Sequence, residues 1–166
     1  FAAIMQAWQV ARGGTAQCVH LSAPAGFGKT RLLSDVANRL RIVGAQVVTV
    51  RADPGVRHIP HLVAGELARA LGGCRGAAGV SSASARVLVA LQPALAATYP
   101  RTEPSYLRED QRYLQATALR ELVEAIADEA PLAILVDDTH WLDPASRDLL
   151  TALATSMEAG PVLFLS

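Results

Sequence analysis

The sequence predicts an α/β protein with a mainly parallel sheet, and two features of the chain support this fold class. Four short apolar runs alternate with longer segments in which apolar residues recur at helical spacing. The runs are apolar throughout, as expected for strands that crossover helices bury on both faces. The expected strands are residues 18–22, 46–51, 132–136 and 161–165.

Helices are expected on either side of these runs. In the first, residues 2–12, Ile4, Trp8 and Ala11 share one face, and Trp8 should pack the helix against the sheet. The last begins at Pro144, with Asp143 as its N-cap, and extends to about Glu158. The other expected helices are residues 29–43, 60–71, 85–97 with a break near Pro93, and 106–129. Residues 72–84, rich in Gly, Ser and Ala, are expected to form a flexible surface loop.

Length and charge narrow the classes of function. A chain of 166 residues corresponds to one domain with a real core. Its 15 basic and 15 acidic residues balance, so no electrostatic signature of nucleic-acid or membrane binding is present. The two cysteines, Cys18 and Cys74, fit a reduced cytoplasmic compartment, and Cys18 is interpreted as a buried thiol. The chain starts at Phe1 and stops directly after an apolar run, so we interpret residues 1–166 as part of a larger protein.

A phosphate-binding loop is predicted between the first strand and the second helix. Residues 23–30 read Ala-Pro-Ala-Gly-Phe-Gly-Lys-Thr, which fits the Walker A pattern except that Ala23 replaces its first glycine. Glycines let backbone N–H groups approach a polyphosphate, and the following helix adds its unpaired N–H groups and positive dipole end. We expect Lys29 to reach the β- and γ-phosphates of a nucleotide and Thr30 to bind Mg²⁺. The residues expected to contact the nucleotide are Ala25, Gly26, Phe27, Gly28, Lys29, Thr30 and Arg31, although the Arg31 side chain is given no role.

An acidic pair ends the third expected strand. Residues 132–138 read Leu-Ala-Ile-Leu-Val-Asp-Asp, a Walker B pattern in which a buried strand holds a carboxylate rigidly at the carboxyl edge of the sheet. Asp137 is expected to hold magnesium, and Asp138 to polarise an attacking water. Because one further strand lies between the two motifs, we expect the sheet order 1-4-3-2, with residues 161–165 between the strands that carry the motifs.

The two motifs resemble those of a known family. The loop at residues 23–30 resembles the P-loop of MalT-like and LuxR-type signal-transduction ATPases, which belong to the STAND class of AAA+-related NTPases. Residues 135–146 resemble their Asp-Asp-x-His-Trp-x-Asp-Pro-x-Ser stretch. The resemblance implies a P-loop NTPase three-layer sandwich, here truncated before the fifth strand and the helical lid.

The resemblance also implies a function. Such modules bind ADP at rest and ATP when activated, with Mg²⁺, and slow hydrolysis resets them; Lys29 and Asp138 would be the catalytic residues. They lie in large bacterial regulators, so the expected partners are the nucleotide, other domains of the parent protein, and further copies on ATP binding. Direct nucleic-acid contact and membrane association are not expected.

Two other functions stay open. A small-molecule phosphotransferase would need an acceptor pocket with cationic lid residues, for which Arg101, Arg108 and Arg112 are the only hint. A degenerate domain that keeps the fold and binds nothing is favoured only by Ala23.

Several other residues have simpler interpretations. His140 and Trp141 lie either near the γ-phosphate or in the packing under the site. His20 is interpreted as a core or strand-pairing residue, and Glu121 and Glu124 as a solvated helix face.

Overall fold

The sheet of this protein is parallel and has the strand order expected from the motifs. A computed structural model describes residues 1–24, 26–100, 102 and 112–166. Within these residues, four strands pair in the order β1-β4-β3-β2, and all of the pairs are parallel. The strands are β1 (Gln17–Val19), β2 (Gln46–Arg51), β3 (Leu132–Asp137) and β4 (Val162–Leu165). The predicted α/β class and sheet order are confirmed.

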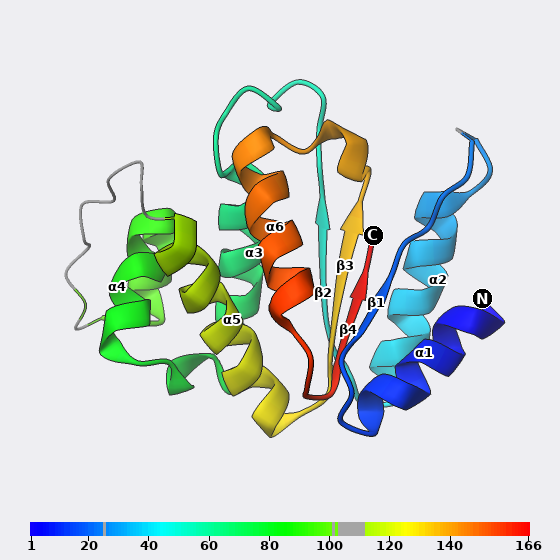
Figure 1. Cartoon of the computed structure of the whole chain (residues 1–166), viewed down its shortest axis with the longest axis horizontal. Helices are drawn as coiled ribbons and strands as arrows, with labels where there is room; N and C mark the ends of the chain where they lie inside the picture. The colour runs from blue at the N-terminus through cyan, green and yellow to red at the C-terminus, as the bar shows by residue number, and fades with distance from the viewer. Residues whose placement is uncertain (25, 101, 103–111) are drawn as a thin grey trace.

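Helices cover both faces of the sheet, which makes three layers (Figure 1). On one face lie α1 (Ala2–Arg12) and α2 (Lys29–Ile42). On the other lie α3 (Leu62–Gly72), α4 (Ser82–Leu91), α5 (Arg112–Glu129) and α6 (Pro144–Ser156). In Figure 1 the carboxyl ends of β2 and β3 point to the top of the molecule, where the loop after β1 also lies.

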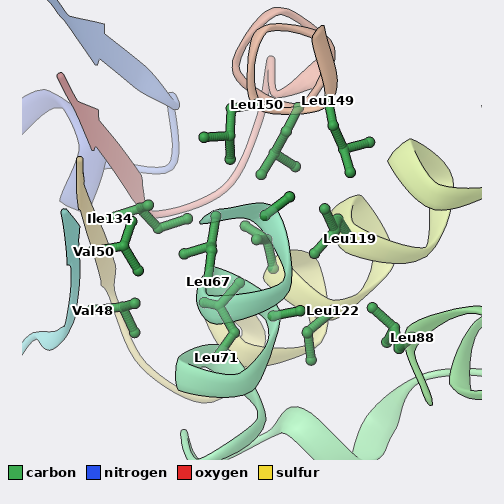
Figure 2. Close-up of a cluster of buried hydrophobic side chains, with 14 of the residues drawn as sticks. Val48, Val50, Leu67, Leu71, Leu88, Leu119, Leu122, Ile134, Leu149 and Leu150 are labelled. Carbon is green, nitrogen blue, oxygen red and sulfur yellow. The ribbon is translucent and has the colours of Figure 1, made fainter. Parts of the chain in front are cut away.

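Two hydrophobic clusters hold the layers together. The smaller one packs Ile4, Trp8 and the apolar face of α2 against alternate residues of β3 and β4, such as Ala133 and Leu163. Trp8 is only 1% exposed, which confirms that it packs the first helix against the sheet. The larger cluster joins the opposite sheet face to four helices, and Figure 2 shows Val48, Val50 and Ile134 facing Leu67 and Leu71. The two central strands, β3 and β4, are buried along their whole length, so both are held from either side.

The segment expected to be a flexible loop, residues 72–84, is more ordered than its composition indicates. It contains the 3₁₀ helix η1 (Ala77–Gly79) and the start of α4, and Ala77 is buried. The reason is α5, since Glu121 accepts hydrogen bonds from Ser81 N (2.5 Å), Ser81 Oγ (3.1 Å) and Ser84 Oγ. Glu121 is therefore partly buried and not part of a solvated face, whereas Glu124 is exposed as expected.

The other helix boundaries agree closely with the sequence. The expected break near Pro93 is real, because α4 ends at Leu91 and a short 3₁₀ helix η2 (Pro93–Ala97) follows. The helix expected over residues 106–129 is observed from Arg112 to Glu129, and residues 106–111 lie outside the described residues. Among the described residues, no helix is long and apolar enough to cross a membrane.

Candidate functional site

The acidic pair lies where the sequence places it, at the carboxyl end of β3. All six residues of β3 are buried, and Asp137 is 5% exposed. Its Oδ1 accepts a hydrogen bond from the Asp138 N–H (2.9 Å), and its carbonyl accepts one from the Ala52 N–H (3.1 Å). The Asp137 carboxylate is therefore held at the sheet edge by a strand that cannot easily shift.

Asp138 turns the chain out of the sheet and forms an ion pair. It adopts a left-handed backbone conformation (φ 56°), which an aspartate tolerates better than most residues. Its Oδ2 accepts a hydrogen bond from Arg51 Nε (2.9 Å) and forms an ion pair with Arg51 Nη2, also at 2.9 Å. The same guanidinium lies 4.0 Å from Asp137 Oδ2.

Arg51, which the sequence analysis did not single out, is the cation that pairs with the two aspartates. It is the last residue of β2, and it is paired in register with Asp137 on the neighbouring strand. A signal was present in the sequence, because two adjacent parallel strands that end in Arg and in Asp must bring these side chains to the same sheet edge.

The phosphate loop has the backbone that its glycines predict. Gly26 (φ 83°) and Gly28 (φ 78°) both adopt left-handed conformations, which residues with a Cβ seldom adopt. A Cβ placed on either glycine would meet no atom within 4 Å, so the space above them is open. Phe27 between them is 76% exposed, and Ala25 lies outside the described residues.

Lys29 begins α2 and folds back over the loop. Its ammonium donates to the carbonyls of Ala23 (2.5 Å) and Pro24 (3.1 Å). The first N–H groups of α2 have no acceptor within the helix, and no side chain caps them, so they are available to an anion. Thr30 and Arg31 are exposed on the same first turn.

One cavity of about 630 Å³ brings the two motifs together. Its wall includes Ala23 and Lys29 from the loop, and Asp137 and Asp138 from the end of β3. Phe164 of β4 and residues of α6 line another part of it. The other predicted contact residues do not belong to this wall; they are Gly26, Phe27, Gly28, Thr30 and Arg31.

The prediction of a buried Cys18 thiol is wrong: Cys18 is exposed, because β1 is the edge strand of the described sheet. His20 is exposed and so is not a core residue, but the strand-pairing alternative holds. The Ser166 N–H donates to the Val19 carbonyl (3.0 Å) and the Leu21 N–H donates to the Ser166 carbonyl (2.6 Å), which pairs His20 with Ser166 just beyond the end of β1. The Cys18 and His20 side chains line the cavity, and His20 Nδ1 lies 3.2 Å from Ser166 Oγ.

Asp143 and Ser146 hold the loops around the acidic pair. Asp143 caps α6 as predicted, since its Oδ1 accepts from Ser146 N (2.8 Å), and it also accepts from His61 N (2.9 Å). Ser146 Oγ accepts from Ala64 N (3.0 Å), so the start of α6 holds the start of α3. Burial alone would raise the pKa of Asp143, but the hydrogen bonds from Ser146 and His61 lower it below its usual value.

His140 and Trp141 follow the acidic pair in a short 3₁₀ helix, η3 (Thr139–Trp141). Their ring centroids are 4.8 Å apart, and Trp141 packs against the larger cluster. His140 is exposed and lines the cavity, so it lies beside the site, whereas Trp141 supports the loop. Arg57 lies over the Trp141 ring, 5.9 Å from its centroid.

Comparison with known proteins gives this arrangement a family. The family of AAA ATPase domains matches residues 1–165, which is nearly the entire chain. The chain belongs to this AAA ATPase domain family. It is also 29% identical, over 181 aligned residues, to an uncharacterized protein of Rhizobium meliloti (strain 1021). That alignment includes 98% of this chain and 17% of the relative, so the chain spans about a sixth of the relative's length. No solved structure matches the chain.

The donor atoms of this AAA ATPase domain suit the cofactors that its family implies. Membership in the family indicates nucleotide binding, typically together with Mg²⁺. Magnesium prefers oxygen ligands, usually one or two carboxylates plus substrate phosphates, and the Asp137 and Asp138 carboxylates and the Thr30 hydroxyl are oxygens of this kind. Within the described part of the chain, no group of three or more His, Cys, Asp or Glu side chains could hold a metal by itself. The site therefore fits a metal that shares its coordination with the nucleotide.

Proposed function

We propose that this domain is an ATP- and ADP-binding regulatory switch module with slow, Mg²⁺-dependent ATP hydrolysis. One observation carries the proposal: Lys29 and the Asp137–Asp138 pair, about a hundred residues apart in the sequence, line the same cavity. An ammonium beside open loop amides suits the phosphates, and a carboxylate pair suits the metal on their far side.

Each residue has a proposed role in binding or hydrolysis. The backbone N–H groups from Ala25 to Arg31 bind the phosphates, and Lys29 leaves its two carbonyl acceptors to contact the β- and γ-phosphates. Thr30 and Asp137 hold Mg²⁺, which neutralises phosphate charge when it is bound. Asp138 orients the attacking water.

We propose slow turnover because the Asp138 carboxylate is paired with Arg51. An effective general base needs a carboxylate that is free to accept a proton from water. In this domain Asp138 Oδ2 accepts a hydrogen bond from Arg51 Nε and is paired with Arg51 Nη2, so this oxygen already has a partner where an attacking water would need one. A rate below about 1 s⁻¹, at the low end of enzyme turnover, suits a switch better than a metabolic enzyme.

The place of the domain in a larger protein is part of the proposal. We propose that residues 1–166 form the partial core of a nucleotide-binding domain in a bacterial signalling or transcriptional regulator, as the resemblance to STAND proteins implies. The relative from Rhizobium meliloti supports a long parent chain, because the aligned region makes up 17% of it. The partners would then be neighbouring domains and, in the ATP state, further copies.

Nucleotide titration tests the proposal directly. Fluorescent ATP and ADP analogues are titrated into the wild type and into Lys29→Ala, with and without Mg²⁺. Removing the only ammonium in this cavity wall should weaken binding at least about 100-fold, or about 2.7 kcal/mol. Arg39→Ala, an exposed cation at the far end of α2, is the matched control and should bind normally.

Product analysis separates this function from the alternatives. A switch releases ADP and phosphate slowly with no acceptor present, whereas a phosphotransferase makes a phosphorylated small product. Of the three arginines that hinted at an acceptor lid, Arg101 and Arg108 lie outside the described residues, and Arg112 pairs with Asp148 (3.1 Å). If wild type and Lys29→Ala bound nucleotide equally, or neither bound it, the proposed function would be wrong.

A further inference from the structure

The acidic pair of this domain already has a cation of its own. Arg51 Nε donates a hydrogen bond to Asp138 Oδ2, Nη2 forms an ion pair with the same oxygen, and Nε is 4.0 Å from Asp137 Oδ2. We propose that Arg51 competes with divalent metal for this pair, so that the domain takes up Mg²⁺ only together with a nucleotide. This inference rests on the proposed function, because it assigns the metal to Asp137.

The geometry puts the guanidinium within reach of both carboxylates. β2 and β3 pair in parallel with Arg51 opposite Asp137, so the arginine leaves the sheet at the same level as the acidic pair. Both of its donors converge on a single oxygen of Asp138, while its nearest approach to Asp137 is on the oxygen that does not accept the Asp138 N–H. That Asp137 oxygen is the one without a hydrogen-bond donor, and a metal bound there would lie beside the positive charge of Arg51.

The charges of the acidic pair, Arg51 and the nucleotide explain why metal would bind only when the nucleotide is present. Two carboxylates and one guanidinium leave a net charge of −1, which attracts a divalent ion weakly against the repulsion from Arg51. A triphosphate on the loop adds several negative charges on the other side of the metal position, and these outweigh one arginine. The Arg51 side chain is 65% exposed, so it can move aside or turn spare N–H donors toward a phosphate without leaving a buried cavity.

The neighbouring cations in the described residues are engaged elsewhere. The Lys29 ammonium donates to Ala23 and Pro24 carbonyls, and the Arg57 guanidinium lies over Trp141. Arg147 donates to the Leu142 carbonyl (3.2 Å). Arg51 is therefore the cation whose removal should change the affinity of the acidic pair for metal, and Arg57→Gln is a control with the same loss of charge nearby.

The test uses metal alone, so it needs no catalytic turnover. Mn²⁺ serves as the probe for the magnesium site, and its binding is measured by electron paramagnetic resonance without nucleotide. We expect Arg51→Gln to bind Mn²⁺ at least about tenfold more tightly than the wild type, in line with removal of a like charge from beside the metal. Arg51→Lys, which keeps the charge, should bind Mn²⁺ as weakly as the wild type does. Arg57→Gln should also have the Mn²⁺ affinity of the wild type.

A second variant locates the metal that the Arg51→Gln domain binds. Adding Asp137→Asn to Arg51→Gln should abolish the gain, because the proposed ligand is gone while the fold keeps an isosteric side chain. Circular dichroism and thermal unfolding check that each variant is folded. Equal Mn²⁺ affinity of wild type and Arg51→Gln, or a gain that persists in the double variant, would overturn the proposal.

Failure of this inference can be told apart from failure of the proposed function. Nucleotide binding without metal depends on the loop and Lys29, and it is measured separately on the same samples. If ATP bound normally and Arg51→Gln left Mn²⁺ affinity unchanged, the competition by Arg51 would be wrong and the switch function would stand. The wild type should bind ATP more tightly with Mn²⁺ than without it. This ratio of ATP affinities should be smaller in Arg51→Gln, because its metal binding no longer depends on the nucleotide.

Discussion

The two halves of the site are built in opposite ways. The acidic half lies at the end of a fully buried strand, and Asp143 and Ser146 hold the loops around it by accepting hydrogen bonds from the His61 and Ala64 N–H groups. The phosphate half is an exposed loop whose shape depends on two glycines with positive φ. Its lysine contacts only carbonyls of the same loop.

This difference separates stability from binding. Residues that support the acidic half are buried among several elements, so their loss should lower the free energy of unfolding. Residues of the phosphate loop face open space, so their loss should alter ligand affinity with a small change in stability. Two substitutions with matched controls, one in each half, test this separation, and a third tests the same contrast between buried and exposed contacts on α5; they are described from the largest expected effect to the smallest.

Asp143→Ala should cause the largest loss of stability. The variant removes the N-cap of α6 and leaves the N–H groups of His61 and Ser146 without their acceptor. A lost cap costs about 1 kcal/mol and an unsatisfied buried N–H about 1–3 kcal/mol, so we expect a total of about 3 kcal/mol. Urea unfolding followed by circular dichroism measures it.

Asp148→Ala on the same helix is the control for this prediction. Asp148 pairs with Arg112 through a side chain that is 58% exposed, and such ion pairs contribute about 0.5 kcal/mol or less. Similar losses for Asp143→Ala and Asp148→Ala would mean that the acidic half is not held by buried hydrogen bonds.

Gly28→Ala should change binding more than stability. With φ at 78° the alanine strains the loop by about 1 kcal/mol, and its Cβ would occupy the open space where a phosphate approaches. We expect nucleotide affinity to fall about tenfold or more, or at least about 1.4 kcal/mol. Fluorescence titration measures the nucleotide affinity, and thermal unfolding of the same sample measures the stability.

Gly44→Ala is the matched control, because Gly44 also has positive φ (87°) and open space around it. It follows α2 at the end away from the phosphate loop, so its strain should be similar and its nucleotide affinity unchanged. If both variants lost affinity to the same extent, the effect would come from α2 stability and not from the loop.

Much of the fold could be predicted because its signals are local or follow from chain order. The spacing of Ile4, Trp8 and Ala11 predicts α1, and the apolar run that ends in Asp137 predicts β3. The sheet order followed from one extra strand between two motifs. Residues 72–84 could not be predicted, because their order comes from Glu121, which lies 40 positions from Ser81 in the sequence.

The site was predictable in its motifs and less so in its contacts. The cavity contains Lys29, Asp137 and Asp138 together, as the motifs indicate. Arg51 was missed because the predicted strand order makes β2 and β3 neighbours but leaves their register open, and only the register places Arg51 opposite Asp137. The burial of Cys18 was predicted wrongly because an apolar run does not show whether a strand is central or at an edge.

Glu121→Gln should have the smallest effect of the three substitutions. It should lower the free energy of unfolding by an amount that depends on pH. Burial would raise the pKa of Glu121, but hydrogen bonds from Ser84 and Ser81, together with Arg120, lower it below its usual value. A carboxyl group with a lowered pKa stabilises the fold above the unfolded pKa, near pH 4, and that contribution is lost as pH falls through the folded pKa. The variant should therefore be less stable than wild type by about 1 kcal/mol at pH 7, and this gap should narrow as pH falls below about 4.

Glu124→Gln, one turn further along α5 and paired with Arg120, is the control. It should differ from wild type by about 0.5 kcal/mol or less at neutral pH. A gap for Glu121→Gln that stayed constant between pH 7 and pH 3 would show that the carboxylate charge does not hold η1 and α4 against α5.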